Sequence, residues 1–117
     1  MYVFPNGYYH YREPVAEGFD KVRFGYKWGV TVERTEFLVV PVRWKGVKYL
    51  SNTLWGVTRD GTMWGIFSTT EQELIIRTRC DEFYYYSDTH IGIRQGNNWF
   101  LFHTSTKNLT NYFGAPL

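Results

Sequence analysis

The sequence has a single cysteine, Cys80, among its 117 residues. One cysteine excludes an internal disulfide and a zinc site built from cysteines, and it is typical of proteins from a reducing compartment. No apolar run approaches the ~18 residues of a membrane-spanning helix, and the N-terminal segment lacks the apolar core of a signal peptide. From these absences we expect a soluble cytoplasmic protein with no membrane partner.

Excess charge of one sign and cofactor motifs are also missing. The formal net charge is only +2, which is too small to imply a nucleic-acid partner by itself. The sequence contains no phosphate-binding loop, no dinucleotide fingerprint, no His-Glu-x-x-His motif and no nucleophile elbow. We therefore expect no cofactor, and no motif indicates a class of enzyme.

Aromatic residues, by contrast, are abundant. Phe, Tyr and Trp make up 21% of the chain, and ten of these residues are tyrosines. Tyrosine and tryptophan combine an apolar body with a polar tip, which suits binding surfaces. Aromatic side chains also favour strands, so part of the excess reflects secondary structure. Many of them fall on otherwise polar strand faces, which favours a binding role for the set.

The pattern of apolar residues predicts strands separated by short turns. Residues 22–33 alternate between apolar and polar without a break, which predicts one long half-buried strand. At the C-terminal end, residues 105–113 followed by Gly114 are typical of a short capped helix. Turn signals recur along the chain, at Asn6-Gly7, Arg34-Thr35, Asp60-Gly61, Asp81-Glu82 and Gly96-Asn97.

These features predict an all-β fold and a single domain over residues 1–117. Consecutive antiparallel hairpins form either a small barrel or a two-layer sandwich, here with at most a short C-terminal helix. No internal repeat of fixed period is evident. The segments 54–57 (Leu-Trp-Gly-Val) and 63–66 (Met-Trp-Gly-Ile) are similar, and we interpret this similarity as the symmetry of one hairpin.

The most informative stretch is a hairpin predicted over residues 89–104. A turn at Gly96-Asn97 would place His90 opposite His103 and Arg94 opposite Trp99, with all four side chains on one face. The other face would be apolar and would carry Ile91, Ile93, Phe100 and Phe102. Two of the three histidines in the chain therefore come together beside an arginine and a tryptophan.

Three interpretations of this histidine pair are open. A zinc site needs three or four ligands, and no third ligand stands at a clear spacing, so we expect no metal. As a catalytic pair, His90 and His103 would be general base and general acid in cleavage of a phosphodiester, with nearby arginines holding the phosphate. As a non-catalytic pair, they would stack at the surface or contact a ligand.

A second constellation is predicted where residues 74–80 turn at Asp81-Glu82 into residues 83–86. This turn would place Arg79 against Tyr84 and Arg77 against Tyr86. Interleaved arginines and aromatic rings serve in binding single-stranded nucleic acid and in protein interfaces, and they also occur as solvated ladders. The neighbouring acidic residues dilute a positive field, which favours a protein partner.

A third feature is a pair of glycines in the hairpin around Asp60-Gly61. In this register Gly56 would face Gly65 and leave a shallow notch. Such a notch accepts either a bulky side chain from within the fold or a small ligand, such as a sugar or a nucleotide-like molecule.

The sequence thus predicts a non-enzymatic module that binds a macromolecule, with a protein partner favoured over single-stranded nucleic acid. A short chain without motifs would also suit a viral or mobile-element inhibitor of a host factor. The alternatives are a metal-independent ribonuclease that uses His90 and His103, and a small-ligand module at Gly56 and Gly65. Unpaired strand edges make a homodimer feasible. The predicted partner-binding residues are Arg77, Arg79, Tyr84, Tyr86, His90, Arg94, Trp99 and His103.

Overall fold

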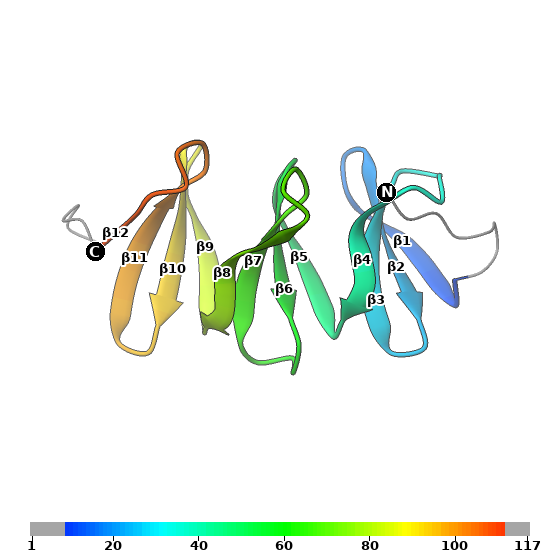
Figure 1. Ribbon diagram of the computed structural model, residues 1–117, viewed down its shortest axis with the longest axis horizontal. Coiled ribbons are helices and arrows are strands. Elements are labelled where there is room, and N and C mark those ends of the chain that lie inside the picture. The colour runs from blue at the N-terminus through cyan, green and yellow to red at the C-terminus, as the bar shows by residue number, and fades with distance from the viewer. Residues whose placement is uncertain (1–8, 112–117) are drawn as a thin grey trace. The chain divides into compact units, whose positions relative to one another are not determined.

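The computed structural model describes residues 9–111, and within this range every regular element is a strand. Twelve strands form three antiparallel sheets of four, each a meander whose strands are connected in chain order (Figure 1). The chain divides into two compact units between Thr78 and Arg79. The described residues contain no helix that is long and apolar enough to cross a membrane.

The strands follow one another with short connections. The first sheet contains β1 (Tyr11–Ala16), β2 (Phe19–Phe24), β3 (Lys27–Val32) and β4 (Leu38–Trp44). The second contains β5 (Gly46–Ser51), β6 (Leu54–Thr58), β7 (Trp64–Ser68) and β8 (Glu73–Cys80). The third contains β9 (Glu82–Ser87), β10 (His90–Gln95), β11 (Asn98–His103) and β12 (Leu109–Asn111).

The all-β prediction is confirmed, one of its two alternative architectures is excluded, and one predicted element is wrong. Each sheet keeps two edge strands within residues 9–111, so none of them closes into the barrel that was one of the alternatives. The described part of the predicted C-terminal helix, Ser105–Asn111, contains a turn and strand β12 instead. The predicted turn at Asn6-Gly7 lies outside the described residues.

The predicted long strand over residues 22–33 is in fact a hairpin. The chain turns at Gly25 and Tyr26, where Gly25 has a φ of +65°, and Phe24 pairs with Lys27. Within this hairpin Val22 of β2 pairs with Gly29 of β3, so Val22 does not lie opposite an apolar residue. Within residues 22–33 the apolar residues keep even numbers through this turn, so those of β2 and those of β3 lie on opposite faces of the sheet, and the unbroken period of two could not reveal the turn.

The first and second sheets share one apolar core. From the first sheet it takes Val30, Val40 and Trp44, and from the second it takes Trp55, Val57 and Phe67, all at most 3% exposed. The ring of Trp44 meets Phe67 edge-on at 6.2 Å between centroids, which is a favourable aromatic geometry. Two of the five tryptophans, Trp44 and Trp55, therefore serve the core.

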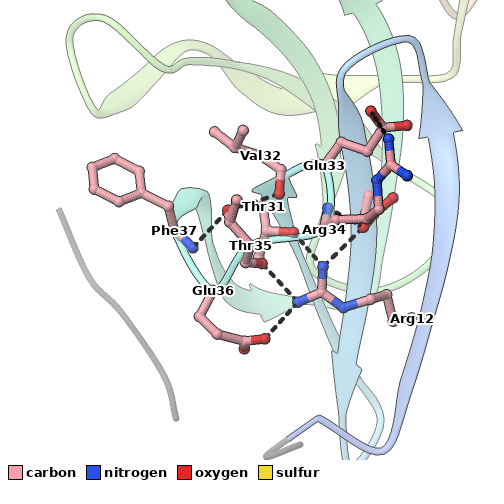
Figure 2. A network of polar contacts seen from close by, with 9 residues as sticks. Arg12, Thr31, Val32, Glu33, Arg34, Thr35, Glu36 and Phe37 are labelled. Atoms are coloured by element: carbon pink, nitrogen blue, oxygen red, sulfur yellow. Dashed lines mark hydrogen bonds and ion pairs between the residues drawn. The ribbon is translucent and has the colours of Figure 1, made fainter. Parts of the chain in front are cut away.

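An arginine clamps the turn between β3 and β4 (Figure 2). Arg12 donates to the buried carboxylate of Asp20 at 2.8 Å, to the carbonyl of Thr35 at 2.7 Å and to Glu36 at 3.1 Å. Asp20 also accepts from the backbone N–H of Arg34 at 2.9 Å, where the chain has a positive φ of 57°. Since Asp20 is only 3% exposed, loss of Arg12 would leave a buried charge unpaired, which costs about 3–5 kcal/mol.

The β6–β7 hairpin has a different register from the one predicted. Gly56 pairs with Ile66 and Gly65 pairs with Val57, so the two glycines do not face each other and the predicted ligand notch does not exist. The connecting loop runs over residues 59–63 because the Asp60 carboxylate accepts the backbone N–H groups of Thr62 and Met63, at 2.8 and 2.9 Å. An odd number of loop residues shifts the pairing by one position.

Gly65 has a different role, which Gly29 shares. A Cβ on Gly65 would lie 2.5 Å from the carbonyl oxygen of Ile76 in β8. A Cβ on Gly29 would lie 2.6 Å from the carbonyl oxygen of Val40 in β4. In both meanders the third strand therefore places a glycine against the backbone of the fourth, eleven residues further along the chain.

This shared contact reveals an internal repeat. Trp28-Gly29 and Trp64-Gly65 begin the third strands of their sheets, thirty-six positions apart. Trp99 lies at the equivalent point of β11, thirty-five positions after Trp64, and is followed by Phe100 in place of glycine. Phe100 pairs with Asn111, again eleven residues further on. Trp28-Gly29 and Trp64-Gly65 thus occupy equivalent positions in tandem meanders, whereas the similar segments 54–57 and 63–66 lie on the two strands of a single hairpin, β6–β7.

We expect Gly65→Ala to destabilise the first unit by about 2 kcal/mol or more, because the added methyl group meets backbone and the β7–β8 pairing has to give way. Gly25→Ala is the control for the added methyl group: nothing lies within 4 Å of the added carbon, and only the φ of +65° at Gly25, a strain that Gly65 does not have, disfavours alanine, so it should cost only about 1 kcal/mol. Urea unfolding of both variants measures the difference, and equal losses would contradict the close-approach explanation.

The loop at Asp60 predicts a dependence of stability on pH. Hydrogen bonds from the N–H groups of Met63 and Thr62 lower the pKa of Asp60 from 3.8 to about 2. Because the folded protein lowers the pKa of Asp60, the ionised carboxylate stabilises the fold at pH values above 3.8. This contribution disappears as the pH falls from 3.8 toward 2. Asp60→Asn lacks the charge, so the difference in melting temperature between the two proteins should shrink between about pH 5 and about pH 2. A difference in melting temperature that stays constant over this pH range would contradict a stabilising role for the Asp60 carboxylate.

Candidate functional site

The β10–β11 hairpin has the register that the sequence predicts. It turns at Gly96 and Asn97, where Gly96 has a φ of +61°. His90 pairs with His103 and Arg94 pairs with Trp99. On the opposite face, Ile93 and Phe102 are at most 2% exposed. The two histidines therefore do lie on the face that also carries Arg94 and Trp99.

The imidazole rings of His90 and His103 are in contact. Their centroids are 4.7 Å apart and their planes are inclined by 80°, so one ring meets the other edge-on. Tyr86 approaches His90 in the same manner at 6.3 Å. We call the side chains on this surface the histidine face, and its members are Tyr84, Tyr86, His90, Arg94, Trp99 and His103.

One nitrogen of each histidine is engaged within the protein. Nδ1 of His103 accepts the backbone N–H groups of Ser105 and Thr106, at 3.2 and 3.1 Å, and so caps the turn after β11. Nδ1 of His90 lies 2.8 Å from the hydroxyl of Thr89. The acceptor role of His103 requires its Nδ1 to be unprotonated, which leaves Nε2 as the nitrogen that carries the proton.

Arg94 is held by carboxylates of its own sheet. Its Nε donates to Glu82 at 2.9 Å, and its Nη1 lies 3.6 Å from Asp81. The hydrogen bond to Glu82 and the charges of both carboxylates raise the pKa of Arg94. Asp81 also accepts the N–H of Gly96 at 2.6 Å. The arginine therefore braces the hairpin and is poorly placed to bind a phosphate.

Tyr84 and Trp99 form the aromatic part of the histidine face. The ring of Tyr84 lies across Gly92, where an added Cβ would come within 1.9 Å of it. Its edge meets Trp99 at 5.3 Å between centroids and an angle of 74°. Trp99 and Tyr86 remain 41% and 48% exposed, so both present ring surface to solvent.

The predicted ladder of arginines and tyrosines is wrong as a pairing. β8 belongs to the second sheet, whereas β9 pairs with β10 in the third. No ladder hydrogen bonds therefore place Arg79 against Tyr84 or Arg77 against Tyr86. Tyr84 pairs with Gly92 instead, and both arginines have exposed side chains on β8.

The first sheet carries a related cluster that the sequence did not predict. Arg23 pairs with Trp28 across β2 and β3, and its guanidinium carbon lies 5.8 Å from the ring centroids of both Trp28 and Tyr11. Tyr11 meets Trp28 edge-on at 5.7 Å. The cluster was missed because residues 22–33 were interpreted as one strand, which puts Arg23 and Trp28 on opposite faces.

Charged neighbours complete this cluster. Lys21 lies 2.9 Å from a carboxylate oxygen of Glu13 and 4.9 Å from the centroid of Trp28. The hydroxyl of Tyr11 donates to the other oxygen of Glu13 at 2.9 Å. The bond to Lys21, followed by that to Tyr11, lowers the pKa of Glu13, and the same carboxylate raises the pKa of Tyr11. Both carboxylate oxygens of Glu13 are therefore engaged, and the carboxyl group is ionised.

A cation above the third-strand tryptophan recurs in every meander. Lys21 and Arg23 lie over Trp28, Lys48 lies 4.3 Å from the centroid of Trp64, and Arg94 lies 6.0 Å from that of Trp99. The first and third sheets share two further features, an arginine directly opposite the tryptophan and a tyrosine against its ring. The charge around these tryptophans differs, because two carboxylates surround Arg94.

Metal and thiol chemistry find little support in the described residues. No group of three or more His, Cys, Asp and Glu side chains between residues 9 and 111 is placed to hold a metal ion. Burial, assisted by the charge of Asp81, raises the pKa of the Cys80 thiol to about 11, and a protonated thiol is a weak nucleophile. The histidine pair and the two tryptophan–arginine clusters therefore remain the sites to consider.

Comparisons of the chain with protein-family models, with curated proteins and with solved structures found no match.

The capping bond of His103 predicts how its substitution affects stability. His103→Ala leaves the N–H groups of Ser105 and Thr106 without their acceptor and should cost about 1–2 kcal/mol. Asparagine accepts from backbone N–H groups at this spacing, so His103→Asn should retain most of the stability. Thermal unfolding of both variants checks this expectation. Equal destabilisation by alanine and asparagine would show that the cap contributes little.

Proposed function

We propose that the protein is a non-enzymatic binding module and that the histidine face engages a protein partner. The observation that carries this proposal is the pairing of Arg94 with Glu82 and Asp81. It removes the free positive charge from the face and leaves exposed aromatic rings, of which Trp99 is the largest. Protein interfaces are enriched in Tyr, Trp and Arg, and their energetic centres are aromatic side chains surrounded by polar groups.

The charge of this face favours a protein over a nucleic acid. One arginine against two carboxylates leaves a net charge of −1 around Trp99. Binding of single-stranded nucleic acid combines aromatic stacking with a positively charged groove, and the histidine face supplies only the rings. A protein segment with neutral or basic residues fits this surface better.

The ribonuclease alternative has weaker support than the sequence suggested. The contact between His90 and His103 remains in its favour. General acid–base cleavage also needs a cation to hold the phosphate, and Arg94 is already neutralised. One nitrogen of His103 is further committed to the backbone of the following turn. The small-ligand alternative at Gly56 and Gly65 has no supporting geometry, because these two glycines do not face each other.

A pull-down that compares two exposed aromatic residues tests the proposal. The tagged protein is incubated with lysate of the organism that encodes the chain and washed at low and at high salt, and the retained proteins and nucleic acids are identified. Trp99→Ala should reduce retention of a specific protein at least about tenfold, because truncation of a central aromatic anchor typically costs 2 kcal/mol or more. The retention should resist salt, since rings and not free charges carry the binding.

Tyr26→Ala is the matched control, because Tyr26 is 78% exposed and lies in the turn between β2 and β3. This variant should retain the same protein as the unmodified chain. Melting temperatures of both variants establish that the fold is intact. Equal retention by both variants would refute the assignment to the histidine face, and retention of nucleic acid that is lost at high salt would replace the protein partner by a nucleic acid.

A further inference from the structure

The first-sheet cluster lines a shallow pocket of about 310 Å³ that is wide open to solvent. Its lining residues are Tyr11, Glu13, Lys21, Arg23 and Trp28. They come from three neighbouring strands, β1, β2 and β3, so a rigid sheet supports every wall. The volume lies at the lower end of the range of about 300–1,000 Å³ that is usual for small-molecule sites. A ligand of one or two rings fits a pocket of this size.

Of the charged residues that line the pocket, Glu13 and Lys21 form an ion pair with each other, whereas Arg23 pairs with no carboxylate in the described part of the chain. Glu13 receives both Lys21 and the hydroxyl of Tyr11, so its two oxygens are occupied. Arg23 donates from Nη1 to the carbonyl of Gly25, which leaves its other N–H groups for further partners. Among the ion pairs of residues 9–111, none joins Arg23 to a carboxylate. The two cations and one carboxylate of the lining leave a net charge of +1, which resides at Arg23.

The third sheet provides an internal comparison. Arg94 stands opposite Trp99 as Arg23 stands opposite Trp28. Two carboxylates surround Arg94, so the same tryptophan–arginine pair has a net charge of −1 in one meander and +1 in the other. Of these two pairs, only the first-sheet pair therefore combines aromatic walls with an arginine whose charge is not neutralised by a carboxylate.

We propose that this pocket binds a planar aromatic ring that carries a single negative charge. The anionic group pairs with the guanidinium of Arg23, since hydrogen bonds between two charged groups are about twice as strong as neutral ones. The ring lies against Tyr11 and Trp28, whose mutually perpendicular planes offer one face and one edge. The proposal is independent of the partner assigned to the histidine face, and neither stands or falls with the other.

The pocket is unsuited to the other common ligands of aromatic sites. Quaternary ammonium groups bind over tryptophan faces, but the net charge of +1 in this pocket repels a cationic ligand. A neutral sugar ring would stack on the aromatic side chains and leave the charge of Arg23 without a partner. An aromatic anion satisfies the rings and the guanidinium together.

Two sources share this chemistry. An aryl carboxylate is a free small molecule with one ring system and one charge. A nucleotide within a single strand has a planar base and one phosphodiester charge. The experiment therefore uses one probe of each kind, 2-naphthoate and a dinucleotide with a single phosphodiester, and measures each against the same pocket.

The binding is followed through the indole N–H signals of the five tryptophans in ¹H–¹⁵N spectra. Trp28→Phe assigns the signal of Trp28. Addition of 2-naphthoate should shift this signal with a Kd on the order of 1 mM, as expected for a fragment of this size. The signals of Trp64 and Trp99 should move far less. Two matched compounds, uncharged 2-naphthamide and non-aromatic cyclohexanecarboxylate, should each bind at least about tenfold more weakly.

Two arginine variants locate the binding. Arg23→Gln should weaken binding of 2-naphthoate at least about tenfold, because it removes the charge that pairs with the anion. Arg94→Gln is the matched control in the third sheet and should leave the affinity unchanged. Because Arg23 also contacts Gly25, the backbone spectrum of Arg23→Gln must match that of the unmodified protein. If it does not, Arg23→Lys, which keeps the charge, provides the comparison and should bind more tightly than Arg23→Gln.

Each outcome decides the question. A shift of Trp28 that needs both the charge and the ring of the probe, and that disappears in Arg23→Gln, supports the proposal. Tighter binding of the dinucleotide than of 2-naphthoate assigns the site to single-stranded nucleic acid, and the reverse assigns it to a free aryl anion. Absence of any Trp28 shift with either probe at about tenfold above the expected Kd, or equal affinity in Arg23→Gln, would overturn it.

Discussion

The architecture depends on how closely the backbones of the third and fourth strands approach in the first two meanders. Gly29 and Gly65 leave room for the carbonyl oxygens of Val40 and Ile76 at distances where no Cβ fits. This contact sets the position of the fourth strand, and so the direction in which the chain leaves each meander. Trp28 and Trp64 precede the two glycines near the start of the third strand in each repeat. In the third meander Phe100 replaces the glycine, and it pairs with Asn111 in an ordinary ladder.

On this common frame, neighbouring charges distinguish the two tryptophan–arginine clusters. In water-exposed positions an arginine over a tryptophan ring contributes only about 0.5–1 kcal/mol, so the pairs themselves do little to stabilise the fold. Their importance lies in what the guanidinium can still bind. Glu82 and Asp81 satisfy Arg94 and tie it to the β10–β11 turn, whereas Glu13 is engaged by Lys21 and leaves Arg23 available. A single geometry thus presents an aromatic surface in one sheet and an anion-binding pocket in another.

The sequence predicted correctly the hairpin in which the apolar positions switch between odd and even numbers at a turn of two residues. The Gly96-Asn97 turn gave the full register of β10 and β11 because both flanking strands have an apolar face that permits only one pairing. Other features depend on information that alternation does not contain. The turn at Gly25 and Tyr26 preserves the period of two and so cannot be seen in it, and Asp60 enlarges its loop through hydrogen bonds to the backbone. Likewise, no local pattern states that β8 belongs with β7 and not with β9.

The candidate sites follow the same division between local and non-local information. The meeting of His90 with His103 and of Arg94 with Trp99 was accessible because each pair spans one hairpin. The engagement of Arg94 by Glu82 was not, because the predicted pairing joined residues 83–86 to residues 74–80, whereas β9 pairs with β10, and this contact changes the chemistry from phosphate binding to an aromatic surface. The first-sheet pocket needs three strands in register before its residues meet. In a meander each inner strand pairs with both of its neighbours in the chain, so the function of a hairpin face depends on the third strand beside it.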